Sequence, residues 1–558
     1  MNPEPRGPLI PTRRRQRAGV GASSVAVFAV LAVLTVLALS SCDGPRTGST
    51  SPGQADSRPA SPGPASPGPT SPGPADPGPT SPRPDGLGPA GHVGPISRPC
   101  HGVAVSVADD IRRVLDAHPP GTTYCLAAGT HRLERPLVPE RGDALIGRRG
   151  AVLSGSKVLT GWRPDGGVWT TTGFLPPAPG TNGECVVSEP TCTTSQDVFL
   201  DDRRLDRVGS RGAVTPGTFH TDYSTNIIAI GDDPRSHLVE QAVAPGLVRS
   251  TVDDVTVANL VLEQAANEAQ SGAVENRRVT PHAAGSGWRI LDNEVRLNHG
   301  VGIGFANAST VTGNDVHHQG QLGLGAWGVG SLVSDNEIAF NGVAGYSPEW
   351  EAGGVKSWMT ERLTLTRNFV HDNRGPGLWS DGGTMDTTYE HNRIEDNWGA
   401  GIQHEISYDA TIRHNEIAGN GRRHKGWAWD AGIQIQSSGG TTRIEVSHNV
   451  VTGNANGITL IDSGHRAGER PAPHGLHVVR NVWVHDNTVT MFPGQVTGAV
   501  QDTGDPAIFT NDNRFDANTY HLPSMTGRHF AWADADVGWL RWRVLGNDID
   551  GQVEPMSR

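Results

Sequence analysis

Residues 368–415 read NFVHDNRGPGLWSDGGTMDTTYEHNRIEDNWGAGIQHEISYDATIRHN and hold two successive copies of one short pattern. The pattern is Asn-x-Ile/Val-x-x-Asn-x-x-x-Gly-Ile/Leu. Its copies start at asparagines 293, 314, 336, 368, 392, 415 and 449, so the steps between them are 21, 22, 32, 24, 23 and 34 residues. A period near 22 residues without a helical phase predicts one coil of a parallel β-helix per copy.

The repeated asparagines predict a ladder, because each coil presents its amide to the same turn of the next coil. Parallel strands joined by crossovers are expected to wind right-handed. The competing solenoid, a leucine-rich repeat, requires a leucine spacing that the chain lacks. We therefore predict an all-β fold, a right-handed parallel β-helix.

Composition agrees with an all-β chain and excludes one class of partner. The 558 residues include 72 glycines and only 35% hydrophobic residues, which disfavours helical bundles. The net charge is 46 − 58 = −12, and no long basic run follows residue 20. Nucleic-acid binding therefore has no electrostatic basis.

The first 98 residues are predicted to be an export signal and a spacer. Basic residues followed by an apolar run from about residue 25 to 39 indicate a signal segment over 1–42. The run ends in Leu39-Ser40-Ser41-Cys42, which resembles a bacterial lipoprotein cleavage box with Cys42 as the lipidated residue. An ordinary signal peptide or an uncleaved anchor remains open. Residues 43–98, rich in Pro, Gly and Ser, predict a disordered linker, so we expect a protein exported to the outer face of the cell membrane, or secreted.

Four cysteines remain for the exported domain, namely Cys100, Cys125, Cys185 and Cys192. Their even number predicts two disulfides. Three connectivities are possible, and the local one, Cys100 with Cys125 and Cys185 with Cys192, is favoured because short loops close easily. No Cys-x-x-Cys pair is present, so we expect no metal, and nothing predicts a cofactor.

The folded domain is predicted to span residues 99–545, including caps at both ends. An apolar stripe within 103–118 predicts a helix that caps the first coil. Short apolar segments after it, such as QDVFLDDRRL from residue 196, read as strands, and residues 160–195 read as a loop excursion. The segment 529–551 predicts a helical C-terminal cap.

Strand parity after each glycine separates buried from outward side chains. The predicted inward set is Ile303, Phe305, Leu324, Ala326, Val355, Ser357, Leu378, Ser380, Ile402, His404, Ile433, Ile435, Ile458 and Leu460. The predicted outward set is Gly325, Trp327, Lys356, Trp358, Trp379, Asp381, Gln403, Glu405, Gln434 and Gln436.

Two acids of the outward set, Asp381 and Glu405, fall in the same column on consecutive coils. Their backbones are therefore expected about 4.8 Å apart, close to the spacing of about 5 to 5.5 Å between the carboxyl groups of retaining glycosidases. Two carboxylates this close resist double ionisation, so one keeps its proton at higher pH. Lys356 on the preceding coil favours ionised Asp381, which leaves Glu405 as the proton donor.

Aromatic residues and long inserts surround this pair. Between Asn373 and Gly377 the interval is four residues, but it is 13 between Asn341 and Gly354 and 12 between Asn420 and Gly432. Such inserts on a rigid scaffold commonly carry function. The predicted substrate-binding residues are Trp327, Trp358, Trp379, Gln403, Gln434, Gln436, Trp350, Trp427, Trp429 and Asp430.

Several charged or polar residues near the outward set have two possible interpretations. His404 has inward parity and is assigned first to a buried polar stack with Ser357 and Ser380, with a proton-transfer role as the alternative. Glu349, Glu351, Asp430 and Asp462 read as solvated loop charges, with a place in the cleft as the alternative.

The repeats resemble the right-handed β-helix superfamily that contains pectate lyases, polygalacturonases and alginate epimerases, over roughly residues 100–545. The motifs Gly-Leu-Trp-Ser-Asp at 377–381 and His-Glu-Ile-Ser at 404–407 are similar to those of the β-helix β-xylosidase family. In that family a Trp-x-Asp nucleophile precedes a Glu acid/base by about one coil. The resemblance implies that Asp381 is the nucleophile and Glu405 the acid/base.

These observations lead to one leading hypothesis, an exported, surface-tethered enzyme that is a retaining glycoside hydrolase. A polysaccharide lyase or uronate epimerase is the first alternative, and it requires a base together with a cation that neutralises a uronate carboxylate. A glycan-binding solenoid without catalysis is the second. We expect a monomer whose partners are a polysaccharide or oligosaccharide and the membrane that holds its anchor.

Overall fold

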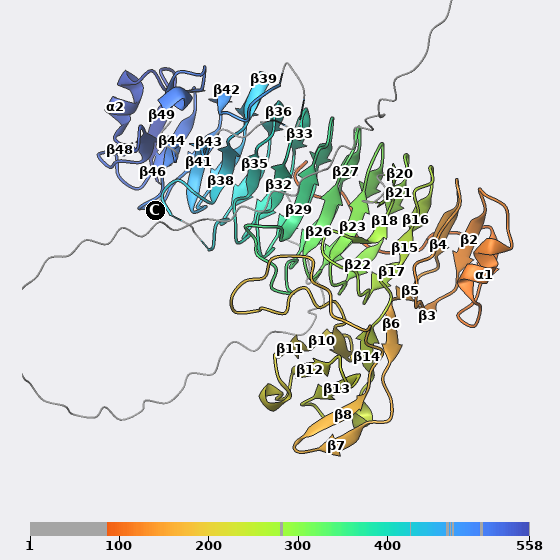
Figure 1. Ribbon diagram of the computed structural model, residues 1–558. Helices are drawn as coiled ribbons and strands as arrows, with labels where there is room; N and C mark the ends of the chain where they lie inside the picture. Colours follow the sequence, from red (N-terminus) through yellow and green to blue (C-terminus); the bar gives the residue numbers. More distant parts are fainter. Residues whose placement is uncertain are drawn as a thin grey trace, which may run out of the picture. The chain divides into compact units, whose positions relative to one another are not determined.

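The computed structural model describes residues 86–558 except 279–282, 424–425, 465–467, 469, 471–473, 503–505 and 557–558. The predicted signal segment with Cys42, and the linker up to residue 85, lie outside the described residues. In the described part, most of the chain winds through three long sheets, named A, B and C below (Figure 1). No helix found there is long and apolar enough to cross a membrane.

The three sheets are built from parallel strands that follow one another coil by coil. Sheet A runs from β1 (Val103–Val105) to β45 (Arg514–Asp516), and sheet B from β3 (Gly129–Arg132) to β49 (Gln552–Pro555). Sheet C carries the candidate site. Its strands are β15 (Val248–Arg249), β18 (Gly272–Glu275), β23 (Val301–Phe305), β26 (Leu322–Ala326), β29 (Gly353–Trp358), β32 (Leu378–Asp381), β35 (Ile402–Glu405), β38 (Ala431–Gln436), β41 (Asn456–Asp462), β44 (Thr497–Gln501), β47 (Phe530–Trp532) and the antiparallel β48 (Ala535–Val537).

The core lies between the three sheets and is filled by the predicted inward side chains. All fourteen of them are buried, including the polar Ser357, Ser380 and His404. The hydroxyl groups of Ser357 and Ser380 lie 3.0 Å apart on adjacent coils. Strand parity therefore predicted these fourteen side chains correctly, but five side chains of the outward set are buried as well, namely Lys356, Trp379, Gln403, Gln434 and Gln436.

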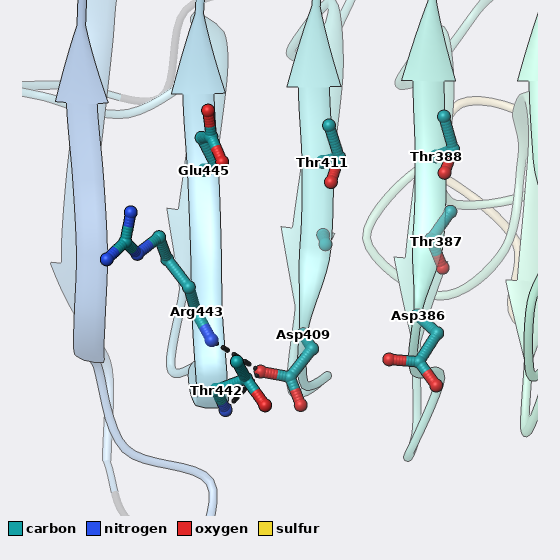
Figure 2. Close-up of a pocket in the computed structure, with 9 residues that line it drawn as sticks. Asp386, Thr387, Thr388, Asp409, Thr411, Thr442, Arg443 and Glu445 are labelled. Atoms are coloured by element: carbon teal, nitrogen blue, oxygen red, sulfur yellow. Dashed lines mark hydrogen bonds between the residues drawn. The ribbon is translucent and has the colours of Figure 1, made fainter.

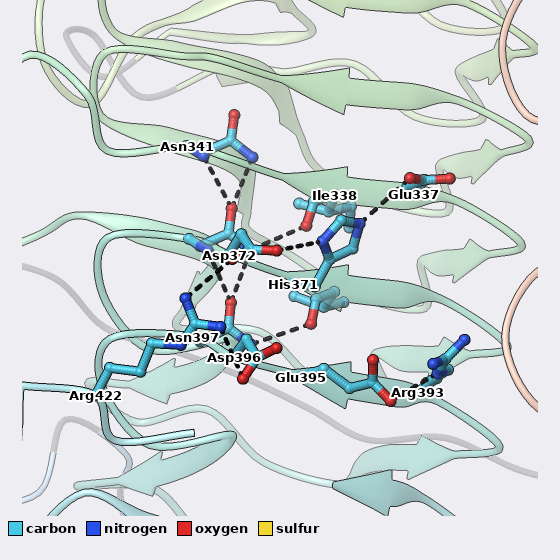
Figure 3. Close-up of polar contacts among 12 residues, drawn as sticks. Glu337, Ile338, Asn341, His371, Asp372, Arg393, Glu395, Asp396, Asn397 and Arg422 are labelled. Atoms are coloured by element: carbon cyan, nitrogen blue, oxygen red, sulfur yellow. Dashed lines mark hydrogen bonds and ion pairs between the residues drawn. The ribbon is translucent and has the colours of Figure 1, made fainter. Parts of the chain in front are cut away.

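Two asparagine ladders run along the turns of the β-helix, as the repeat predicts. In the first ladder, Asn368 Nδ2 donates to Asn392 Oδ1 at 3.0 Å, and Asn392 Nδ2 donates to Asn415 Oδ1 at 3.0 Å. Figure 3 shows part of the second ladder, in which Asn341 and Asn397 lie on either side of the coil between them. Each amide also bonds to backbone groups, so the ladders satisfy buried polar groups at the turns.

Replacing Asn392 with alanine is expected to reduce the free energy of unfolding by about 3–5 kcal/mol. The substitution leaves the buried Asn368 N–H and the Leu365 carbonyl without the partners that they have at 3.0 and 2.9 Å. Chemical denaturation followed by tryptophan fluorescence measures the loss. As a control, Asn182→Ala removes an exposed amide with a single bond to Ala269 and is expected to cost less than about 0.5 kcal/mol. Equal losses in the two variants would contradict a structural role for the ladder.

The N-terminal cap differs from the predicted helix over 103–118. Val103–Val105 form strand β1, which pairs with β2 (Thr123–Leu126), and the helix α1 is limited to Ile111–Asp116. Asp110 caps the helix by accepting from the Arg112 N–H, so the turn before it ends the strand and starts the helix. Ile111 and Leu115 point into the core as the apolar stripe predicts.

Residues 156–242 form a separate insertion between the first coils, larger than the predicted excursion over 160–195. It contains a four-stranded sheet from β6 (Ser156–Val158) to β14 (Val239–Ala242) and a five-stranded sheet that includes β8 (Val168–Thr172). Its own core includes Phe219 and Ile230. The strand predicted from residue 196 belongs to this insertion as β9 (Val198–Leu200), because alternation identifies a strand but not its sheet.

Residues 86–98, assigned above to the disordered linker, lie along the β-helix instead. The Gly88 N–H donates to the His391 carbonyl at 3.1 Å, and the Gly94 N–H donates to the Gly313 carbonyl at 2.8 Å. Arg98 pairs with Asp292 at 2.5 Å. These are mostly backbone contacts, which leave no hydrophobic pattern in the sequence and so could not be predicted.

The C-terminal helix and the disulfides follow the sequence-based expectation, but the folded domain extends past the predicted end at residue 545, because β49 pairs with β46 (Thr519–Leu522). Helix α2 (Trp539–Val544) buries Trp542, whose indole N–H donates to Asp548 at 2.8 Å. Asp548 also accepts from Asn518 and thereby ends the first ladder. The disulfides are the local pairs, Cys100–Cys125 and Cys185–Cys192.

Candidate active site

Asp381 and Glu405 stand at the ends of neighbouring strands of sheet C. Asp381 ends β32, and Glu405 ends β35 one coil later. The two strands are in register, since Trp379 pairs with Gln403. Neighbouring strands lie about 4.8 Å apart, so both carboxylates project from one outward column.

Lys356 contacts the first of these acids directly. Its Nζ lies 2.9 Å from Asp381 Oδ2, 3.9 Å from the centre of the Trp379 ring and 3.7 Å from Glu351 Oε1. Burial lowers the pKa of Lys356, but the carboxylates of Glu351 and Asp381 outweigh it, so the pKa is raised above its ordinary value. Lys356 is therefore a cation at neutral pH and favours an ionised Asp381.

Glu405 is held by three donors on its two oxygens. Trp379 Nε1 and Gln403 Nε2 lie 3.0 and 2.8 Å from Oε2, and Gln436 Nε2 lies 2.9 Å from Oε1. Gln434 acts behind this set, because its Nε2 donates to Gln436 Oε1 at 3.0 Å. The carboxyl group is thereby fixed in orientation.

A pocket of about 200 Å³ opens beside Glu405. It is bounded by residues of the two long inserts, the first over 342–353 and the second over 421–423 and 426–431, and by the turns that precede β32 and β35. Aromatic and polar groups alternate around it, which suits a ligand with both apolar faces and hydroxyl groups. The lining residues are Pro348, Glu349, Pro376, Trp379, Trp398, Gly399, Gln403, Glu405, Arg423, Trp429, Asp430 and Gln436.

Only some of the predicted binding residues line this pocket. Trp379, Gln403, Gln436, Trp429 and Asp430 line it. Gln434 supports it from behind, as described above. The remaining four predicted residues, Trp327, Trp350, Trp358 and Trp427, are not among the lining residues.

The four tryptophans outside the pocket have identifiable neighbours. Trp350 packs on Tyr346, with ring centres 6.1 Å apart, and its carbonyl oxygen accepts from Lys356 at 3.1 Å. The indole N–H of Trp427 donates to Asp536 at 2.7 Å. Trp327 lies under the Arg277 guanidinium, 3.3 Å from the ring centre.

Trp358 lies on the preceding coil and pairs in register with Asp381. It is 41% exposed, so it forms an open aromatic surface next to Asp381. Its indole covers Gly382, where an added Cβ would come within 2.1 Å of Nε1. Gly382 has a φ of +46°, and its N–H donates to Asp381 Oδ1 at 2.7 Å. A glycine at this position therefore lets both contacts form.

His404 lies in the core, behind the outward side chains of sheet C. Burial lowers the pKa of His404 to about 4, so the ring is neutral at neutral pH. Its Nε2 donates to the Tyr408 carbonyl at 2.6 Å, and its ring meets the Tyr389 ring edge-on. This position fits the supporting role and places His404 away from the pocket.

Four charged or aromatic groups of the site were not selected from the sequence. Trp398 lines the pocket from the turn that precedes β35, and Arg423 lines it from the second insert. The Arg423 guanidinium lies 3.8 Å from the centre of the Trp398 ring. Glu351, which reads as solvated, is 5% exposed instead and lies beside Lys356. Arg470 donates to the carbonyls of residues 359, 360 and 383 and thereby holds the turn after Asp381.

An ion-pair network supports the second insert from below (Figure 3). Arg422 bridges Asp372 at 3.2 Å and Asp396 at 2.8 Å. Asp372 also bonds His371, which in turn contacts Glu337. Burial alone would lower the pKa of His371, but its hydrogen bonds to the two acids raise it to about 9. The network therefore joins three coils beneath the insert.

A larger groove of about 380 Å³ lies on sheet A, over β33 (Thr387–Glu390), β36 (Ala410–Arg413) and β39 (Gly439–Ser447). Figure 2 shows Asp409 accepting from the backbone N–H groups of Thr442 and Arg443. Partial burial and the neighbouring Asp409 raise the pKa of Asp386. The groove has no aromatic lining residue to stack on a sugar, so we place the candidate site on sheet C despite its smaller pocket.

In the part of the chain that the structure describes, no group of three or more His, Cys, Asp or Glu side chains is arranged to hold a metal ion.

Comparisons with known proteins agree with the topology. A family model for the right-handed β-helix region matches residues 282–426 and 383–482. A solved complex of XylC with xylose aligns with a TM-score of 0.57 at 15% identity, covering 80% of this chain and 83% of that chain. This likeness concerns the fold. None of the curated proteins matches the chain in sequence.

Two further solved structures align less well. The A-module of mannuronan C-5 epimerase AlgE6 from Azotobacter vinelandii gives a TM-score of 0.45 at 13% identity, covering 79% of this chain and 92% of that chain. The catalytic unit of a GH87 alpha-1,3-glucanase from Streptomyces thermodiastaticus gives 0.44 at 13% identity, covering 82% and 68%.

Proposed function

We propose that this chain, a right-handed parallel β-helix, is a retaining glycoside hydrolase with Asp381 as nucleophile and Glu405 as acid/base. One observation carries the proposal: two carboxylates end neighbouring, in-register strands, and Lys356 pairs with the first at 2.9 Å. A separation of about 5 Å between carboxyl groups is the spacing at which one acid can attack the sugar directly.

In the first step, an Asp381 oxygen forms a bond to the anomeric carbon as the bond to the leaving oxygen breaks. The proton of Glu405 passes to that leaving oxygen, so the aglycone departs neutral and a glycosyl ester remains on Asp381. Lys356 orients the attacking carboxylate through its contact with Oδ2.

In the second step, Glu405 takes a proton from water, and the water oxygen displaces Asp381 from the anomeric carbon. Both bonds to the anomeric carbon are made with inversion, so the product keeps the configuration of the substrate. The amides of Gln403 and Gln436 are suited to Glu405 in both states, because an amide can present either its NH₂ or its carbonyl oxygen.

The pocket supports a carbohydrate substrate and indicates its size. A volume of about 200 Å³ lies below the typical range of about 300–1,000 Å³ for drug-sized ligands, which favours one sugar ring in the pocket. Trp398 and Trp429 supply aromatic faces, and the exposed Trp358 supplies a second surface across Asp381. We also propose that the enzyme acts outside the cell, held there by the predicted lipid on Cys42.

Lys356 does not supply the cation that the lyase or epimerase alternative needs. Those reactions need a cation that is free to neutralise the carboxylate of a uronate. Lys356 is 8% exposed, and both Glu351 and Asp381 already compensate its charge. A glycan-binding protein without catalysis would not require the paired acids.

The test is a panel of aryl glycosides and polysaccharides, scored for reducing ends and for unsaturated products. On any substrate that is turned over, proton NMR of the first product follows its anomeric configuration before it equilibrates. We expect reducing ends and net retention. Inversion, unsaturated ends, or tight glycan binding without turnover would each reject the proposal.

A further inference from the structure

Lys356 lies between two carboxylates, although the proposed reaction uses only one of them. Asp381 Oδ2 is 2.9 Å from Nζ, and Glu351 Oε1 is 3.7 Å from it. The Trp350 carbonyl, 3.1 Å away, completes the arrangement. Glu351 belongs to the insert that precedes β29, so this insert supplies part of the lysine's surroundings.

Glu351 is itself buried and fixed in orientation. It is 5% exposed, and its Oε2 accepts from Gln270 Nε2 at 2.5 Å. Arg277 adds a second positive charge whose field reaches Glu351. A buried carboxylate is costly unless it is paired and hydrogen-bonded, and Glu351 meets both conditions through Lys356 and Gln270.

We infer that Glu351 is a positioning residue that keeps Lys356 protonated and in place while Asp381 loses its charge as the glycosyl ester. The inference rests on the proposed function. When the ester forms, the contact with Asp381 no longer supplies a negative charge. Burial then favours neutral lysine unless another anion remains.

Glu351 supplies that remaining anion. With Lys356 still protonated, its N–H continues to donate to the Asp381 oxygen that does not carry the sugar. That contact stabilises the carboxylate that departs in the second step. Loss of Glu351 is therefore expected to slow release of the sugar more than formation of the ester.

The kinetic test uses Glu351→Gln, which keeps the shape of the side chain and removes its charge. On an aryl glycoside with a very good leaving group, kcat reports the second step, and we expect it to fall about 10- to 100-fold. The glycosyl-enzyme is expected to accumulate and to be visible by intact-protein mass spectrometry. The basic limb of the pH profile of kcat is expected to move to lower pH, and Glu351→Asp should restore part of the loss.

The matched control is Glu395→Gln, on sheet B. Glu395 also pairs with a cation, Arg393, at 2.7 Å, but it lies on another face of the β-helix. Its pH profile and kcat are expected to match those of the unmodified protein. A Glu351→Gln variant whose kcat falls without any movement of the basic limb would show a merely structural role and overturn the inference.

A second measurement is independent of turnover. The chain has only three lysines, Lys157, Lys356 and Lys425. Protein labelled with ¹³C at the lysine ε carbon therefore gives three NMR signals, which Lys157→Arg and Lys425→Arg variants assign. Asp381→Asn imitates the loss of charge that accompanies ester formation.

In the Asp381→Asn background, the Lys356 signal is expected to titrate at least about one pH unit higher when Glu351 is present than when it is glutamine. The groups facing Lys356 are Glu351, Asp381 and Glu405, and only the first two differ among these variants. Equal titration in both variants would overturn the inference, even if the protein hydrolyses glycosides. If no glycoside is hydrolysed, the proposed function fails, and with it the role during ester formation; the titration then still decides whether Glu351 keeps Lys356 protonated.

Discussion

Asp381→Asn is expected to lower kcat/KM by at least about 10⁴-fold, because the variant has no carboxylate to attack the anomeric carbon. The amide is nearly the same size, and Asp381 is a partly exposed residue at a strand end, so the fold is expected to remain. In a second variant, Asp381→Ala, the truncated side chain leaves room for an external nucleophile, and added azide is expected to restore turnover. A single displacement by azide gives a glycosyl azide of inverted configuration, which NMR identifies.

The matched control is Asp386→Asn, in the groove on sheet A (Figure 2). It removes an aspartate from the larger groove, and kcat/KM is expected to change by less than about twofold. If Asp386→Asn abolished turnover and Asp381→Asn did not, the site would lie on sheet A and the assignment of the nucleophile would be wrong.

Glu405→Gln is expected to show an effect that depends on the leaving group. The variant cannot donate a proton, so glycosides with poor leaving groups should lose about 10²- to 10⁴-fold in kcat/KM. Aryl glycosides that need no proton should still form the ester at a rate near that of the unmodified enzyme. Azide then attacks the ester, and the glycosyl azide is expected to have retained configuration.

Together the two variants decide which acid has which role. Glu445→Gln, in the sheet A groove, serves as the control for Glu405→Gln and is expected to leave every rate unchanged. If azide gave the inverted product with Glu405→Gln and the retained product with Asp381→Ala, the roles of the two acids would be exchanged.

Much of the β-helix could be predicted from the sequence because its determinants are local and periodic. Asn368, Asn392 and Asn415 recur at one point of each coil, and strand parity after each glycine placed Ser380 and His404 inside. The insertion over 156–242 could not be recognised as a separate body. Its strands alternate as solenoid strands do, and their sheet depends on pairing between distant segments.

Only those site residues that lie on strands could be predicted from the sequence by parity. Asp381, Glu405 and Lys356 share one face by parity alone, which the register confirms. Trp398 and Glu351 lie on a corner and in an insert, where no period applies. The burial of Glu351 depends on Gln270, which is 81 residues away in the sequence, so its apparent solvation was the wrong reading.

The two asparagine ladders have a consequence for how such a site can diverge. Asp381 and Glu405 directly follow the paired residues Ser380 and His404, so the spacing of their backbones is set by the step of about 4.8 Å between neighbouring strands, which every coil shares. The inserts that shape the pocket lie outside the strands, at corners of the β-helix where the length of the chain can change without moving a strand. Changes in the inserts can therefore alter which sugar is accepted during evolution. The stereochemical course of the reaction does not change with them, because it depends on the spacing of the main-chain strands.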